Sequence, residues 1–148
     1  MSAAATLPVP VDASLFTWPA DEPHLLGGRC RACGAITFPA ARVCPRCAAD
    51  DVERHELATE GTLWSYTVQG FRPKSPPYAG DDTGETFRPY GVGYVELPGE
   101  VRVETRLTVD DPDRLRIGMP MRLAIVPFRR DGEGHEVLTF AFAPIEED

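Results

Sequence analysis

The stretches Cys30-Arg-Ala-Cys33 and Cys44-Pro-Arg-Cys47 decide the fold of this chain, because together they hold all four of its cysteines. In each pair two residues separate the cysteines, which curls the backbone into a knuckle and aims both sulfurs at one ion. Two knuckles joined by a short loop make a tetrathiolate clamp. The spacing therefore predicts a rubredoxin-like zinc ribbon, with a structural Zn²⁺ held by Cys30, Cys33, Cys44 and Cys47.

The residues around the knuckles support this interpretation. Gly34 directly follows the first pair, where such a turn favours a positive backbone φ. Ala48 holds the matching place after the second pair and suits it less well. In the loop between the pairs, Ile36, Phe38 and Val43 are expected to pack beneath the metal as a small core.

Other states of the cysteines stay open. Two disulfides or four free thiols are alternatives, but the sequence begins Met-Ser-Ala-Ala-Ala without a basic and apolar leader. That start predicts a cytoplasmic protein, and disulfides are rare in the reducing cytosol. An iron centre uses the same ligands, although the loop between the pairs is far shorter than in rubredoxin-like sequences. Four cysteine ligands leave no open coordination position for catalysis.

Composition narrows the remaining choices. The 148 residues are 43% hydrophobic and 26% charged, which allows one modest core plus the metal module and predicts no membrane span. A net charge of −8 disfavours binding to a phosphate backbone. The segment 24–49 has no acidic residue but carries Arg29, Arg31, Arg42 and Arg46. These arginines either balance the metal–thiolate cluster or meet a phosphate or an acidic partner.

Three parts are predicted along the chain: an N-terminal arm over 1–23, the zinc ribbon over 24–56 and a barrel domain over 57–148. Residues 1–13 lack periodicity, so they are expected to lie outside the core and to be mobile or ordered by a partner. Later in the arm, Phe16 and Trp18 either cover the zinc module or anchor a partner.

Alternating apolar and polar residues predict five strands, over 61–70, 90–97, 101–109, 119–128 and 137–143. In the first strand Trp64, Tyr66 and Val68 are expected to share one face. A helical turn is predicted at 110–113, between the third and fourth strands. This element order predicts a mainly β protein, with the ribbon followed by a five-stranded OB-fold barrel, and another five-stranded barrel is the alternative.

A long loop over 72–89 interrupts the strand pattern. It holds Lys74, the only lysine of the chain, together with Arg72, Arg88, Tyr78 and Phe87. In an OB barrel the loop between the first two strands borders the usual ligand face. The loop is therefore expected to be functional, or else disordered until a ligand or partner binds.

No catalytic constellation is visible in the sequence. His24, His55 and His135 are scattered, and no metalloprotease, hydrolase-elbow or dinucleotide motif is present. All cysteines are assigned to the metal, so no thiol remains as a nucleophile. The chain by itself is predicted to be non-catalytic.

Several motifs together resemble one known family. Besides the two cysteine pairs they are Leu15, Phe16 and Trp18, Leu26-x-x-Arg29, Phe38-Pro39, Gly61-Thr62, Val95-Glu-Leu97 and Leu115-x-Ile-Gly-Met119. From about Leu15 to Phe142 the chain resembles the zinc-ribbon plus OB-fold family long catalogued as a domain of unknown function. It departs from that pattern in its proline-interrupted N-terminal segment and its long Pro/Gly loop.

The resemblance implies an accessory role. Family members are similar to small subunits of thiolase-fold, lipid-transfer-protein-like enzymes that act on coenzyme A thioesters, including thiolases and retro-aldolases of steroid side chains. It implies a heteromeric partner, expected as a heterotetramer, and a channel for acyl-CoA. The candidate contacts are Arg72, Lys74 and Arg88 for CoA phosphates, and Phe16, Trp18, Tyr78 and Phe87 for the partner or channel.

Two other functions remain as alternatives. Zinc ribbons and OB barrels also serve as single-stranded nucleic-acid-binding modules, which the acidic net charge disfavours. A pure scaffold, which stabilises a partner without approaching any ligand, is the third interpretation.

Overall fold

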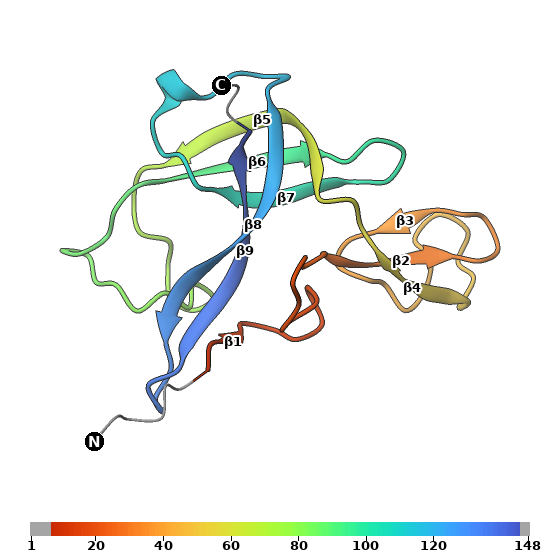
Figure 1. The fold of residues 1–148 in the computed structure, drawn as a ribbon, viewed down its shortest axis with the longest axis horizontal. Coiled ribbons are helices and arrows are strands. Elements are labelled where there is room, and N and C mark those ends of the chain that lie inside the picture. Colours follow the sequence, from red (N-terminus) through yellow and green to blue (C-terminus); the bar gives the residue numbers. More distant parts are fainter. Residues whose placement is uncertain (1–6, 146–148) are drawn as a thin grey trace.

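Two β-sheets and one 3-10 helix make up the computed structural model, which describes residues 7–145 (Figure 1). The first six residues of the predicted arm and the acidic tail from 146 lie outside the described residues. No helix among residues 7–145 is long and apolar enough to cross a membrane. The elements are β1 (Val9–Pro10), β2 (Leu26–Cys30), β3 (Ile36–Thr37), β4 (Val52–Glu56), β5 (Glu60–Gln69), β6 (Tyr90–Glu96), β7 (Arg102–Leu107), the 3-10 helix (Pro112–Arg114), β8 (Pro120–Arg130) and β9 (Glu136–Pro144).

The five strands β5 to β9 close into a barrel, which confirms the predicted OB-fold architecture. They follow the order β5-β6-β7-β9-β8, and β8 pairs back onto β5 to close the ring. All of these pairings are antiparallel except β7 with β9, which run parallel at Arg106↔Ala141 and Leu107↔Phe142. The predicted turn between the third and fourth strands is the 3-10 helix, capped by the side chain of Asp111, which accepts from the N–H of Asp113.

A β-bulge in β5 changes which side chains face the barrel interior. The register with β6 shifts between Leu63 and Ser65. Leu63 is buried, and Tyr66 packs against the core and donates its hydroxyl proton to the carbonyl of Leu115 at 3.2 Å. Trp64 is 47% exposed on the outer face. The expectation that Trp64 and Tyr66 share a face is therefore wrong, because the extra residue of the bulge interrupts the alternation of period two.

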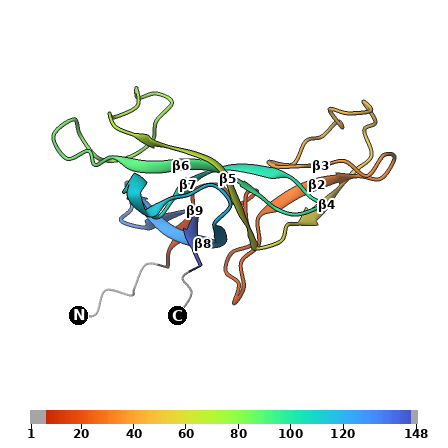
Figure 2. The same ribbon diagram turned by 90° about the horizontal axis from the view of Figure 1, so that it is seen from above.

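The ribbon and the barrel share one hydrophobic core. The ribbon sheet has the order β3-β2-β4, and the residues that flank it, Leu25 and Leu57, are fully buried in the same cluster as barrel residues such as Phe142. Phe16 also belongs to this cluster and forms a β-bridge with Leu25. Figure 2 shows the ribbon beside one end of the barrel, with the loop between β5 and β6 at the opposite end.

The N-terminal arm is ordered against the barrel over its described part. Val9 and Pro10 form β1, which pairs parallel with β9, and the N–H of Val11 donates to the carbonyl of Leu138 at 2.7 Å. The indole of Trp18 donates to the carbonyl of Pro8 at 3.3 Å. The expectation that residues 1–13 are mobile unless a partner orders them is wrong for residues 9–11, because the edge of the β8–β9 hairpin offers free backbone partners to them. None of residues 7–13 is buried, as expected for a segment outside the core. The hairpin runs past the barrel toward β1 in Figure 1.

We predict that Gly91→Ala destabilises the barrel. A methyl group at this buried position of β6 would lie 2.3 Å from the carbonyl oxygen of Val109, a backbone atom that cannot move aside alone. Overpacking of this kind costs about 1–3 kcal/mol. Gly132→Ala is the matched control, because nothing lies within 4 Å of its added methyl group. Urea denaturation measures both variants, and equal free energies of unfolding for the two would contradict this packing.

Candidate metal centre and ligand groove

The four predicted cysteines converge on one point. The sulfurs of Cys30 and Cys47 are 3.6 Å apart, those of Cys33 and Cys44 are also 3.6 Å apart, and all four lie within 4.8 Å of one another. A zinc–sulfur distance of about 2.3 Å in a tetrahedron requires sulfur separations of about 3.8 Å. The four sulfurs therefore fit a metal of that size, and its chemistry would be structural because all four positions are filled by cysteine.

The two knuckles have the same backbone geometry. In the first, Gly34 has φ of 81° and its N–H donates to the carbonyl of Cys30 at 2.8 Å. In the second, Ala48 has φ of 64° and its N–H donates to the carbonyl of Cys44, also at 2.8 Å. The second knuckle thus adopts the left-handed conformation although alanine is less suited to it than glycine.

Backbone N–H groups at the second knuckle favour the thiolate form of Cys44. The N–H groups of Cys47 and Arg46 point at Cys44 and lower its pKa to about 7. The donor–sulfur distance from the N–H of Arg46 is 3.4 Å. A metal-binding cysteine must be deprotonated, so this arrangement prepares the ligand for its role.

Two of the ribbon arginines are paired with strand β4. The Arg31 guanidinium lies 3.1 Å from the Glu53 carboxylate and 3.3 Å from that of Asp51, and Arg29 lies 3.9 Å from Glu53. All of these side chains are at least one-third exposed. The pairs therefore add little stability, and these two arginines are balanced by carboxylates of the chain itself.

Phe38 leaves the metal and contacts the barrel. Its ring meets that of Phe140 of β9 edge to face, with centroids 5.4 Å apart. Val43, which was expected under the metal, is 51% exposed. The predicted small core beneath the metal is therefore wrong in this respect, because the loop between the knuckles turns its largest side chain toward the neighbouring barrel, where more apolar area is buried.

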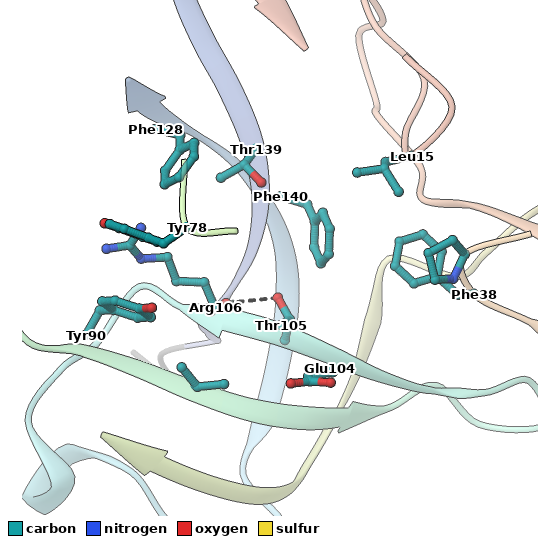
Figure 3. Close-up of a pocket in the computed structure, with 12 residues that line it drawn as sticks. Leu15, Phe38, Tyr78, Tyr90, Glu104, Thr105, Arg106, Phe128, Thr139 and Phe140 are labelled. Atoms are coloured by element: carbon teal, nitrogen blue, oxygen red, sulfur yellow. Dashed lines mark hydrogen bonds between the residues drawn. The ribbon is translucent and has the colours of Figure 1, made fainter. Parts of the chain in front are cut away.

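This contact forms one wall of a groove with a volume of about 550 Å³ (Figure 3). The groove lies between the ribbon, the outer face of β6 and β7, the β8–β9 hairpin and the loop after β5. Its size and its mainly aromatic and aliphatic walls are typical of sites for small molecules. The lining residues are Leu15, Phe38, Pro39, Tyr78, Tyr90, Val92, Glu104, Thr105, Arg106, Phe128, Thr139 and Phe140.

Arg106 is the cationic side chain among the lining residues. Its guanidinium carbon lies 4.0 Å from the centroid of the Tyr90 ring, and Figure 3 shows it beside both Tyr90 and Tyr78. Burial raises the pKa of Tyr78, the nearby Asp82 carboxylate adds to the rise, and Arg106 acts in the opposite direction. Glu104 lies on the same strand, away from the guanidinium, as the acidic group of the groove.

The loop after β5 brings one predicted residue into the groove and leaves the others outside. Tyr78 lines the groove and meets the ring of Phe128 edge to face, with ring centroids 6.1 Å apart. Arg72 lies over the Tyr78 ring and forms an ion pair with Asp82 at 3.5 Å. The predicted CoA-binding residues Lys74 and Arg88 are exposed, and Phe87 packs against Tyr90 with centroids 6.0 Å apart.

The two aromatic residues of the arm serve the fold in this structure. Phe16 is 1% exposed within the shared core, and Trp18 packs against the same cluster. Both rings thus contribute to the core that the ribbon shares with the barrel, and neither lies in the groove lining. Both face a second hollow, between the arm and β2 and β4.

Sequence reasoning missed most of the groove. Arg106 and Glu104 alternate with apolar residues in the strand predicted over 101–109, a pattern typical of a solvent-exposed face, while Leu15, Phe38 and Phe140 fall in three segments far apart along the chain. The one feature of the sequence that could have indicated a groove is the length of the last two strands. An extended β8–β9 hairpin must leave the barrel and can face its outer surface.

Together these features define a class: a zinc-ribbon protein fused to an OB-fold barrel, with a ligand-sized groove at their junction. The models of two domains of one family match the chain, the ChsH2 rubredoxin-like zinc ribbon over residues 17–53 and the ChsH2 C-terminal OB-fold domain over residues 54–126. The chain belongs to this ChsH2-type (DUF35) family, which confirms the resemblance noted in the sequence.

Three similar proteins show the range of the family. The chain is 30% identical over 133 residues to the benzoylsuccinyl-CoA thiolase subunit BbsA of Thauera aromatica, covering 88% of this chain and 85% of that protein. It is 28% identical over 124 residues, 82% of each protein, to a DUF35 domain-containing scaffold protein of Methanocaldococcus jannaschii. Among solved structures, the Ltp2-ChsH2(DUF35) aldolase matches with a TM-score of 0.59 and 31% identity, covering 82% of this chain and 84% of that one.

We predict that the purified protein binds one zinc ion and that its removal unfolds the ribbon. Structural zinc contributes about 10–16 kcal/mol of apparent binding free energy, so Cys44→Ser should abolish stoichiometric zinc and lower the Tm by roughly 10 °C or more. Because Leu25 and Leu57 tie the ribbon to the barrel core, the barrel should lose stability too.

Metal analysis and calorimetry measure these effects. Val43→Ser is the control, since this exposed residue of the same loop should leave zinc content and Tm unchanged. A Cys44→Ser protein with an unaltered Tm would show that the metal does not organise the fold.

Proposed function

We propose that this chain is the accessory subunit of a heteromeric enzyme whose thiolase-fold partner makes or breaks a carbon–carbon bond in an acyl-CoA thioester. A retro-aldolase of the steroid side-chain type is favoured, followed by a thiolase. The chain supplies one wall of the acyl-CoA channel, and the partner supplies the reacting groups.

Family membership is the observation that carries this proposal. One relative is named as a thiolase subunit and the structural neighbour is named as an aldolase complex, and each aligns with more than four-fifths of this chain. The shared region is therefore the whole ribbon-barrel unit and not a single motif. This argues that the unit works in the same kind of assembly here.

The chemistry of the groove agrees with an accessory role. Its lining contains no histidine, cysteine or lysine, so it offers neither a nucleophile with an adjacent base nor a Schiff-base amine. Aromatic rings and one cation suit binding and positioning. Such a groove suits a subunit that holds a ligand while a second protein supplies the reactive groups.

The loop after β5 is proposed as the site of CoA contact. Lys74 and Arg88 are exposed cations beside the segment that contributes Tyr78 to the groove, and phosphates bind such groups. Arg72 is a weaker candidate, because it is already paired with Asp82. The partner surface is proposed to include the rim of the groove, Phe87 of the loop after β5 and Trp18 of the neighbouring arm, whereas the buried Phe16 is not available for a partner.

A pure scaffold is the second candidate function. The name of the archaeal relative describes a scaffold protein, and it aligns over 82% of this chain. Under that function the groove would be an assembly surface, and no part of the chain would touch the thioester.

Co-expression tests the proposal directly. The chain, co-expressed with a thiolase-fold protein from the same organism, should co-purify in a fixed ratio and cleave or form acyl-CoA carbon–carbon bonds, whereas the chain alone should show no turnover. Size-exclusion chromatography with mass measurement and a CoA-release assay read both outcomes. Turnover by the lone chain, or failure of the two proteins to associate, would contradict the proposal.

We predict that the double variant Lys74→Ala and Arg88→Ala weakens binding of a CoA thioester to the complex by about tenfold, since two charge-assisted contacts to phosphate are lost. Arg130→Ala, which removes an exposed cation of the β8–β9 turn, should leave the affinity unchanged. Isothermal titration of each complex gives the Kd values. Equal Kd values for wild type and the double variant would reassign the CoA phosphates to other residues.

A further inference from the structure

Among residues 7–145, three arginines lie over aromatic rings, and they differ in the partner of their N–H edge. Arg102 lies 4.1 Å from the centroid of the Trp64 ring, Arg72 lies 5.0 Å from that of Tyr78, and Arg106 lies 4.0 Å from that of Tyr90. An aromatic face holds a guanidinium in place while leaving its N–H edge free to bind an anion. The anion that pairs with the N–H edge therefore indicates whether each arginine stabilises the fold or binds a ligand.

Two of the three arginines receive a carboxylate from the chain. Arg102 is 2.9 Å from the carboxylate of Glu96, and Arg72 is 3.5 Å from that of Asp82. Each of these sites is complete, with the cation held between a ring and an acidic side chain. They fix the loop and the outer face of the barrel.

Arg106 has an aromatic ring but no carboxylate partner within residues 7–145. Its guanidinium lies over the Tyr90 ring, and no carboxylate of residues 7–145 lies within ion-pair distance of it. The space beside it is the groove, with Tyr78 on the other side in Figure 3. A cation held by aromatic rings at the edge of a concave apolar cavity leaves the position of the anion to a ligand.

We infer that the groove binds an amphipathic carboxylate, whose carboxylate pairs with Arg106 between Tyr78 and Tyr90 and whose apolar body lies against Phe38 and Phe140. This site is distinct from the CoA-phosphate contacts proposed on the loop, which involve neither Arg106 nor the far wall of the groove.

The charges of the groove favour a carboxylate over a phosphate. Arg106 supplies one positive charge, and Glu104 adds a negative one further along the same strand. A phosphate monoester carries nearly two negative charges at neutral pH and would leave one unbalanced, whereas a carboxylate carries one. Glu104 also sets the direction of the ligand, because it repels an anion at its own end of the groove.

If the proposed function holds, the carboxylate site also defines the substrate class. The substrates are then acyl-CoA thioesters whose acyl group bears a carboxylate and an apolar segment. The test below uses the chain without a partner. Its failure would therefore leave the proposed assembly standing, and failure of the assembly would leave this binding site standing.

The experiment compares two probes that differ only in charge, 4-phenylbutanoate and 4-phenylbutanamide, by NMR titration of the zinc-loaded full chain. The carboxylate should bind about tenfold more tightly than the amide, and the largest amide shifts should fall on β6, β7 and β9 around the groove. In Arg106→Gln the two Kd values should become equal, through a loss of carboxylate affinity with the amide affinity retained.

Arg102→Gln is the matched control. It removes an arginine that lies on the same face of β7 and also covers an aromatic ring, but that pairs with the carboxylate of Glu96. It should keep the full preference for the carboxylate. Arg106→Lys, which keeps the charge, should keep part of it and serves as the second variant should the glutamine variant fail to fold.

Three results would overturn the inference: equal Kd values for the two probes in the wild-type chain, a carboxylate preference that survives in Arg106→Gln, or shifts around Arg106 produced by inorganic phosphate at lower concentration than by 4-phenylbutanoate. The first would show that Arg106 does not recognise the charge of a ligand in the groove, and the third would assign the site to a phosphate group.

Discussion

Convergence of four cysteine sulfurs on one point is the constraint on which the rest of this structure depends. The ribbon sheet has only short strands, and it cannot bury enough apolar surface to fold without a metal. Holding the two knuckles together fixes the loop between them, and this loop carries Phe38 to Phe140 of the barrel. The groove therefore has its far wall only when the metal site is formed, so a structural metal distant from any chemistry still determines the shape of the binding surface.

The same junction explains why ribbon and barrel act as one unit. Leu25 and Leu57 flank the ribbon sheet and are completely buried among barrel residues, and Phe16 of the arm closes the same cluster. A second link is polar: the His55 imidazole of β4 lies 2.6 Å from the carboxylate of Glu100 in the β6–β7 turn, which also accepts from the N–H of Ala58. Because apolar and polar contacts both cross the junction, the ribbon is positioned against the barrel and does not swing on a linker.

The sequence predicts the local features of this protein well. Metal ligation follows from cysteine spacing within a few residues, and the strands follow from alternation, so the ribbon and the five-stranded barrel could both be predicted. The groove could not, because its walls come from the arm, the ribbon, two barrel strands and a hairpin that meet only after folding. Arg106 has the pattern of an exposed strand residue and only the tertiary structure shows that it faces a cavity. The bulge at Leu63 and Ser65 is likewise invisible in an alternating run.

Hydrogen exchange of the purified complex with its thiolase-like partner tests the central claim that this chain forms part of a ligand channel. Addition of an acyl-CoA thioester should slow exchange at the backbone amides of β6, β7 and the loop after β5, while the amides of the cysteine knuckles should exchange at unchanged rates. Unchanged exchange around the groove, in a complex shown to bind the thioester, would mean that the chain is a scaffold that never meets the ligand.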